Sequence, residues 1–267
     1  MTDGNRRPPA PRTLKMGETA MDALRHLRTH TPHGVRLAAL PFTAVFLVEG
    51  MTALFAPGNP GLALLGAAVA LIAYTMFLVD WHRLMLLGSA QASPRLTPDS
   101  RDLRFFLRSL LVGVVVGVIV ALPLVVFAPG LIAMPGGLYL FQIVASLLGL
   151  TGMLAAGGTL PATAIGKTCT LGDSWRATRA VLPTLLGLVF MIVAPLHLFG
   201  LSAQIAYHMA AQAGTFVVPA LVVAQALTFL ELAVFATLLS LVYRRRIQAH
   251  SGANGRGDAT WEAGDDA

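Results

Sequence analysis

Two carboxylates lie inside long apolar stretches, where an ionisable side chain is unusual. Glu49 lies in the run that ends at Ala56, and Glu231 lies in the run that ends before Arg244. An unpaired charge in an apolar environment is costly, so both residues are candidates for holding a proton or a cation. About 20 Å of helix separates each of them from a flanking arginine, Arg36 or Arg244, which predicts a similar depth for the two carboxylates.

Glu231 has polar neighbours on its own predicted helix. Gln225 and Thr228 precede it at intervals of three residues and would turn toward the same side. The candidate polar site is therefore Glu49, Gln225, Thr228 and Glu231. One interpretation is a proton or cation site. The other is a pair of neutral carboxyls that hydrogen-bond between helices and stabilise their packing.

The sequence contains no motif of a known catalytic or nucleotide-binding site. It lacks H-E-x-x-H, G-x-S-x-G and the P-loop pattern. His26, His30 and His33 are close enough in sequence to suggest a metal site, but Pro32 interrupts the predicted helix and no further ligand is near. We therefore expect no enzymatic activity, no cofactor and no bound metal.

The composition indicates a membrane protein. Of the 267 residues, 55% are hydrophobic and 12% are charged. A soluble domain carries about 25% charged residues. The net charge of +6 could suggest nucleic-acid binding, but the basic residues are confined to segments between apolar runs. We expect no nucleic-acid partner.

Six apolar runs are each close to the ~20 residues that a helix needs to cross a bilayer. They predict an all-α membrane protein with six transmembrane helices in three hairpins, forming one domain over residues 19–246. The predicted spans are about 37–56, 61–80, 107–128, 138–160, 183–200 and 217–243. The basic segment 1–18 and the Gly/Asp-rich segment 247–267 are predicted to be disordered tails.

The distribution of charge predicts an orientation. All 19 Lys and Arg fall before the first span, after the last, in the second and fourth connections, or, for Arg108, at the beginning of the third span. The other three connections contain no charged residue. By the positive-inside rule both termini are cytoplasmic, and this basic belt is expected to contact anionic lipids.

A T-x-x-D-x-x-R-x-x-R pattern occurs twice and predicts short amphipathic helices on the cytoplasmic side. Thr170 would cap the second copy, with Asp173 at the third helical position, and Thr19 would cap the first copy. Pro32 and Pro183 would break the helix before the following span. A third basic segment precedes the span at 107–128. We interpret these segments as lipid anchors; partner binding is the alternative. The candidate cytoplasmic motif is Asp22, Arg25, Arg28, Asp80, Trp81, His82, Arg83, Asp173, Trp175, Arg176 and Arg179.

Three polar residues after the fifth span recur at every fourth position. Gln204, His208 and Gln212 would share one face of a short helix. We predict that this helix lies on the outer leaflet with that face in water. The alternative is the mouth of a pathway through the membrane.

Small residues also recur at every fourth position in the third span. Gly113, Gly117 and Ala121 are typical of a close helix–helix contact. We expect this face to pack against the fourth span, and the alternative is a contact between two copies of the chain.

Two cytoplasmic segments resemble motifs of a known family. W-H-R-x-x-L-L-G (Trp81–Gly88) and D-S-W-R-x-T-R (Asp173–Arg179) are similar to motifs of an uncharacterised family of bacterial six-span inner-membrane proteins. The resemblance covers most of the membrane region but not the tails, and Ser89 stands where that family often has Glu. It implies six spans and a bacterial inner membrane, and it implies no activity.

These observations predict a multi-pass protein of the bacterial inner (plasma) membrane. Its most plausible role is non-catalytic, in membrane assembly or in contact with lipids or proteins. The expected partner is a second copy or another membrane protein. The alternative is a small-molecule or ion transporter or channel that uses the intramembrane carboxylates.

Overall fold

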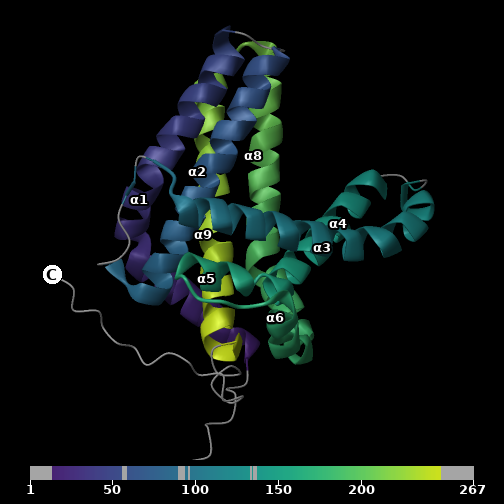
Figure 1. Ribbon diagram of the computed structural model, residues 1–267. Coiled ribbons are helices and arrows are strands. Elements are labelled where there is room, and N and C mark those ends of the chain that lie inside the picture. Colours follow the sequence, from purple (N-terminus) through teal and green to yellow (C-terminus); the bar gives the residue numbers. More distant parts are fainter. Residues whose placement is uncertain are drawn as a thin grey trace, which may run out of the picture.

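The computed structural model describes residues 14–55, 59–89, 94–95, 97–132, 134 and 137–247, and its elements are helices (Figure 1). The long helices are α1 (Met16–Phe55), α2 (Pro60–Leu87), α3 (Ser100–Ile132), α4 (Gly137–Ala156), α8 (Ala194–Ala213) and α9 (Val217–Val242). The short helices α5 (Thr159–Ala164), α6 (Leu171–Thr178) and α7 (Leu182–Leu188) lie between α4 and α8.

Within the described residues, five segments are long and apolar enough to cross a membrane. They are Met16–Phe55, Pro60–Leu87, Ser100–Leu122, Leu171–Ala213 and Val217–Ile247, and α4 adds a shorter apolar segment, Ile143–Ala156. These segments support the prediction of an all-α, multi-pass membrane protein.

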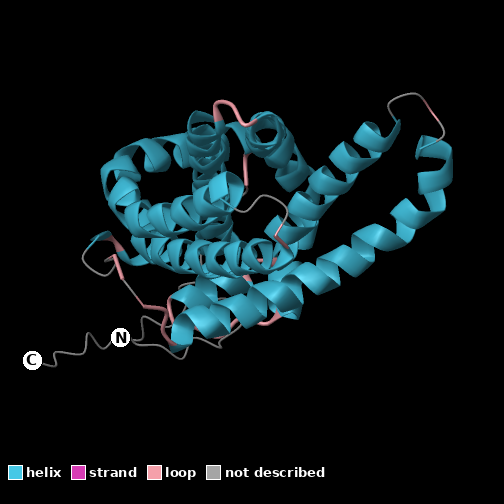
Figure 2. Cartoon of the chain, turned by 90° about the horizontal axis from the view of Figure 1, so that it is seen from above, coloured by secondary structure: helices cyan, strands magenta, loops and turns pink. Residues whose placement is uncertain are grey.

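Four long helices form a bundle along one axis. α1, α2 and α8 each pack against α9, and α1 also packs along α2 (Figure 1). The α3/α4 pair lies across this axis and extends away from the bundle, as the view from above also shows (Figure 2). Only one end of the pair is attached, where α3 contacts α2 and α5 and α4 contacts α6 and α7. Three parallel hairpins would require this pair to be aligned with the other helices, and it is not.

The main core lies where α4, α7 and α9 converge near the attached end of the α3/α4 pair. Leu154, Leu185, Leu188 and Leu238 are fully buried in it. Leu14 also belongs to this core, and α1 already begins at Met16. The predicted tail over residues 1–18 is thus ordered in its last part. Residues 1–13 and 248–267 lie outside the described residues.

The first predicted amphipathic helix is not separate from the first span. α1 runs for 40 residues without a break and contains both Pro32 and Pro41. Tertiary contacts hold its two halves in line, because Ala20 and Ala23 are buried in the main core and Gly34 packs against Trp81. Packing of this kind outweighs the hydrogen bond lost at proline.

The polar residues after the fifth predicted span also belong to a continuous helix. A five-residue π-turn (Val189–Val193) joins α7 to α8, and α8 continues to Ala213. Gln204, His208 and Gln212 therefore lie on the bundle helix α8, and the prediction of a separate helix on the outer leaflet is wrong.

The small-residue face of α3 is not used in its contact with α4. A methyl group added at Gly113 or Gly117 would meet nothing within 4 Å. The close approach is made instead by Gly152 of α4, which packs against Val116 of α3. The predicted contact between the third and fourth spans is confirmed, but the predicted face of α3 is wrong.

The contact between Gly34 and Trp81 gives the first test. A Cβ at position 34 would overlap the Trp81 ring, so we expect Gly34→Ala to lower the free energy of unfolding by about 1–3 kcal/mol. The measurement is thermal unfolding in detergent. Gly113→Ala is the matched control and should leave the midpoint unchanged or slightly higher, because position 113 is open. Equal stability of the two variants would contradict the predicted α1–α2 contact.

Candidate functional site

A cavity of about 430 Å³ lies between α1, α2 and α8, near the end of the bundle where α1 ends and α2 begins. Each helix contributes residues at helical spacing, so each presents one face to the cavity. The lining residues are Glu49, Thr52 and Ala53 from α1, Leu62, Ala63, Gly66 and Ala67 from α2, and Gln204, Tyr207, His208, Ala211 and Gln212 from α8. The structure thus brings Glu49 together with the polar face of α8, which the sequence analysis treated as separate features.

A hydrogen-bond chain holds Glu49 in the cavity wall. The Tyr74 hydroxyl donates to Oε1 of Gln225 over 2.9 Å, and Nε2 of Gln225 donates to Oε2 of Glu49 over 2.6 Å. Gln225 is buried, so its amide has little other choice of partner. The chain joins α1, α2 and α9 through one side chain from each helix.

A second polar group joins α8 to α9. Nδ1 of His197 lies 2.8 Å from Oε1 of Glu231. Nε2 of Gln204 donates to the Thr228 hydroxyl over 3.3 Å. A Cβ at Gly200 would lie 3.4 Å from Oε2 of Glu231, so the absence of a side chain there leaves room for the carboxylate.

The four residues of the predicted polar site therefore form two groups rather than one. Gln225 turns toward Glu49, whereas Thr228 and Glu231 turn toward α8. Glu49 is level with Gln225, about 9 Å along α9 from Glu231. The prediction of equal depth is not met, because it took Arg36 as the cytoplasmic end of the first span.

Sequence reasoning missed three residues of these groups, Tyr74, His197 and Tyr207. Tyr74 and His197 lie in apolar stretches with no polar residue three or four positions away, whereas Tyr207 follows Gln204 by three residues, a spacing that could have marked it. Their importance depends on which helices are neighbours, and no periodic pattern within one helix carries that information.

At the other end of the bundle, Arg95 is surrounded by three carboxylates. Its Nη2 lies 2.9 Å from Oδ1 of Asp80 and 2.9 Å from Oδ1 of Asp102, and its Nη1 lies 3.0 Å from Asp99. Burial alone would lower the pKa of Arg95, but the hydrogen bonds and charges of Asp102 and Asp80 outweigh it and raise this pKa. We call Arg95, Asp80, Asp99 and Asp102 the ion cluster.

Two residues of the predicted motif that follow Asp80 are buried inside the bundle. Trp81 donates its indole N–H to the Thr237 hydroxyl over 2.9 Å, and Nδ1 of His82 lies 2.8 Å from the Ser240 hydroxyl. Both pairs join α2 to α9. Trp81 therefore contacts protein and not the lipid interface that the sequence suggested.

The second copy of the repeated pattern forms the predicted capped helix. Thr170 and Asp173 make a reciprocal capping box at the start of α6, and Asp173 pairs with Arg176 over 2.6 Å. Trp175, Arg176 and Arg179 are exposed. In the first copy Arg25 pairs with Asp22 over 3.2 Å on the surface of α1, and Arg28 is exposed. The basic side chains of both copies are therefore available to an anionic surface.

Arginines at the end of α9 hold the neighbouring elements. Arg244 donates to the Met85 carbonyl in the last turn of α2 over 2.6 Å, and Arg246 donates to the Ala177 carbonyl in the last turn of α6 over 3.1 Å.

Arg245, between them, contacts the first copy of the repeated pattern. It donates to the Thr19 hydroxyl over 2.9 Å and pairs with Asp22. The end of α9 is therefore level with the beginning of α1 and not with Arg36, which is the reason why the predicted depths differ from the structure.

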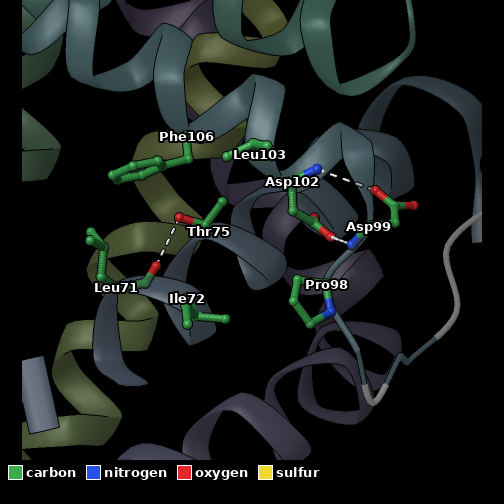
Figure 3. A pocket seen from close by; sticks show the side chains of 8 residues that line it. All are labelled: Leu71, Ile72, Thr75, Pro98, Asp99, Asp102, Leu103 and Phe106. Carbon is green, nitrogen blue, oxygen red and sulfur yellow. Dashed lines mark hydrogen bonds between the residues drawn. The ribbon is translucent and has the colours of Figure 1, made fainter. Parts of the chain in front are cut away.

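A second, mostly apolar cavity of about 270 Å³ lies between α2 and the beginning of α3 (Figure 3). Thr75 and Phe106 line it from the two helices, and Asp99 and Asp102 lie at its edge. These two aspartates accept hydrogen bonds from each other's backbone N–H, over 2.7 and 3.2 Å, and both pair with Arg95. Both carboxylates already bind the Arg95 guanidinium, so a cationic ligand in this cavity would have to compete with Arg95.

The two ends of the bundle thus differ in what they can do. The cavity has a carboxylate whose hydrogen-bonding partner, Gln225, is neutral, and it has space beside that carboxylate. The ion cluster already holds a cation, the guanidinium of Arg95, between its carboxylates. Binding of a proton or a cation is therefore best supported at Glu49.

Comparisons of the chain with protein-family models, with curated proteins and with solved structures found no match. The functional assignment therefore depends on the chemistry of the site.

The ion cluster gives a test that depends on pH. Arg95→Met leaves buried carboxylates without a cation, so we expect a loss of about 3 kcal/mol in unfolding free energy at pH 7. Burial opposes the charge of Asp99, but backbone N–H groups and Arg95 together lower its pKa. A carboxyl whose pKa is lower in the folded state than its unfolded value of about 3.9 stabilises the folded protein at pH above that value. This stabilisation is lost as the pH falls through the folded pKa. In Arg95→Met, protonation of the aspartates instead relieves the repulsion between their negative charges.

The difference between wild type and Arg95→Met, measured as thermal midpoints in detergent, should therefore shrink as the pH falls from 7 to about 3. Arg101→Met, which removes an exposed arginine of the same segment, is the control and should differ little from wild type at any pH. A difference that is independent of pH would show that Arg95 acts through packing alone.

Proposed function

We propose that this protein is a membrane transporter for protons or cations, built on the α1/α2/α8/α9 bundle. The observation that carries the proposal is the cavity that places Glu49 beside Gln204, His208 and Tyr207. Carboxylates inside a membrane helix that face a cavity typically mark ion or proton pathways. Sequence alone favoured a non-catalytic role in assembly, and the cavity changes that preference.

Polar side chains along α9 support a route from the cavity toward the opposite end of the bundle, where Arg244, Arg245 and Arg246 follow α9. We call this end the arginine end. They occur at positions 225, 228, 231, 237 and 240, which span about 20 Å of helix. Each has a partner on another bundle helix. Gln225 pairs with Glu49 and Tyr74, Thr228 pairs with Gln204, and Glu231 pairs with His197. Thr237 pairs with Trp81, and Ser240 pairs with His82. Such a series of hydrogen-bonding groups offers a proton or a cation successive polar contacts through the bundle.

We infer that the arginine end faces the cytoplasm of a bacterial inner membrane, so that both termini are inside. The positive-inside rule supports this orientation, because the arginines at positions 244–246, 176 and 179 lie at that end. Exposed Trp175, Arg176 and Arg179 fit contact with anionic lipid headgroups.

We also infer that α3 and α4 lie within the bilayer and complete six spans. α3 exposes large apolar side chains over about half of its circumference, from Leu110 through Val118 to Ile119, and its other side buries the apolar Val112 and Val116. A helix that lies on the membrane surface needs one polar face. An all-round apolar helix instead needs hydrocarbon or protein on each side.

Cysteine labelling tests this topology. A membrane-impermeant maleimide applied from outside should label Thr215→Cys and Met134→Cys but not Thr29→Cys, all of which are exposed positions. The native Cys169 gives little background, because burial raises the pKa of its thiol to about 11. Labelling of Met134→Cys only from inside would show four spans, with the α3/α4 pair on the cytoplasmic side.

Transport is tested in proteoliposomes with a pH-sensitive dye and with potassium and sodium gradients. We expect Glu49→Gln and Glu231→Gln to reduce the flux of wild type at least 10-fold, because each removes an ionisable group from the route. Glu18→Gln is the matched control, since Glu18 is exposed and forms its ion pair with the exposed Lys15 on the surface of α1. Equal flux in all three variants would contradict the proposal.

Membrane assembly is the second candidate function, and the exposed apolar sides of the α3/α4 pair favour it. Recovery of a stoichiometric partner after mild solubilisation, together with no flux by the wild type, would favour this function over transport.

A further inference from the structure

We propose that the cavity between α1, α2 and α8 binds a small organic ammonium ion with an apolar body. This inference rests on the proposed transport function, because it names the substrate class of that same site. It depends on three properties of the cavity: its charge, its walls and its size.

The charge of the cavity favours a cation. Glu49 is the only acid among the lining residues, and the only basic side chain among them is the imidazole of His208. The Oε2 atom of Glu49 accepts a hydrogen bond from the neutral amide of Gln225, so this partner supplies no positive charge. A carboxylate in an apolar bundle is stabilised by an opposite charge, and a ligand ammonium would supply both that charge and hydrogen-bond donors.

The walls favour an apolar body next to the charged group. Ala53, Ala63, Gly66 and Ala67 form a small-residue surface on the α1 and α2 sides. Opposite them, Tyr207 contributes an aromatic ring from α8. Aromatic faces attract ammonium groups by cation–π interaction, and the small apolar side chains leave room for methyl or methylene groups.

The size of the cavity excludes a bare ion as the best fit. A volume of about 430 Å³ lies within the range of about 300–1,000 Å³ that is typical of small-molecule sites. A metal ion or a proton at Glu49 would leave most of this space without a partner. The amides of Gln204 and Gln212 can bind further polar atoms of an organic ligand at the α8 side.

Matched probes separate the charge from the apolar body. n-Butylammonium, n-butanol and butyrate share one carbon chain and differ in charge. Purified full-length protein in detergent is titrated with each probe at pH 7.5, with heat of binding and thermal midpoint as readouts. We expect saturable binding of butylammonium, with n-butanol and butyrate at least 10-fold weaker.

Two pairs of variants locate the site. Glu49→Gln should weaken butylammonium binding at least 10-fold, whereas Glu18→Gln, which changes an exposed carboxylate outside the cavity, should bind as wild type. Ala67→Phe keeps the carboxylate but fills the cavity and should also weaken binding. Ala68→Phe is its control, because Ala68 is exposed and does not line the cavity.

Three results would overturn the inference: n-butanol bound as tightly as butylammonium, unchanged binding by Glu49→Gln, or no saturable binding of butylammonium. The outcomes also separate this inference from the proposed function. Binding that depends on Glu49, without flux in proteoliposomes, would support the ammonium site and contradict transport. Proton flux that depends on Glu231, without butylammonium binding, would support transport and contradict the ammonium site.

Discussion

The arginines at the end of α9 fix how the elements of the arginine end meet. Arg244 and Arg246 donate to carbonyls in the last turns of α2 and α6, and Arg245 binds Thr19 and Asp22 of α1. The last carbonyls of a helix have no partner within it, and that end carries partial negative charge. Arg244 and Arg246 therefore satisfy terminal carbonyls of α2 and α6, and Arg245 binds side chains near the beginning of α1. Together these contacts set the height of the three helices relative to α9.

The polar interior depends on this register. A shift of α9 by one turn, about 5.4 Å, would separate Gln225 from Glu49 and Glu231 from His197 together. Leaving a buried polar group without its partner costs about 1–3 kcal/mol, while a formed pair contributes only about 1 kcal/mol. The pairs along α9 therefore add little to the total stability. Their main effect is to make other registers of α9 unfavourable, so that one register is specified.

The sequence predicted features that depend on neighbouring residues along the chain. Apolar length indicated the helices, and Thr170 with Asp173 indicated the beginning of α6, as the structure shows. Local rules failed where contacts between distant segments outweighed them. Pro32 predicted a break, but the packing of Gly34 on Trp81 and of Ala23 in the core keeps α1 continuous. The site was predicted only in parts, since the pairing of Glu49 with Gln225 depends on which helices are neighbours.

The bundle is polar at both ends, and the cavity beside Glu49 lies at one of them. The Trp81–Thr237 and His82–Ser240 pairs join α2 to α9 toward the other end, and the ion cluster is level with them through Asp80. Under the proposed function, this arrangement corresponds to a conformation accessible from the side opposite the arginines. Release toward the cytoplasm would require the two α2–α9 pairs to separate. Trp81 and His82 are hydrogen-bonded through neutral partners, so their separation would expose no unpaired charge, in contrast to a break in the ion cluster.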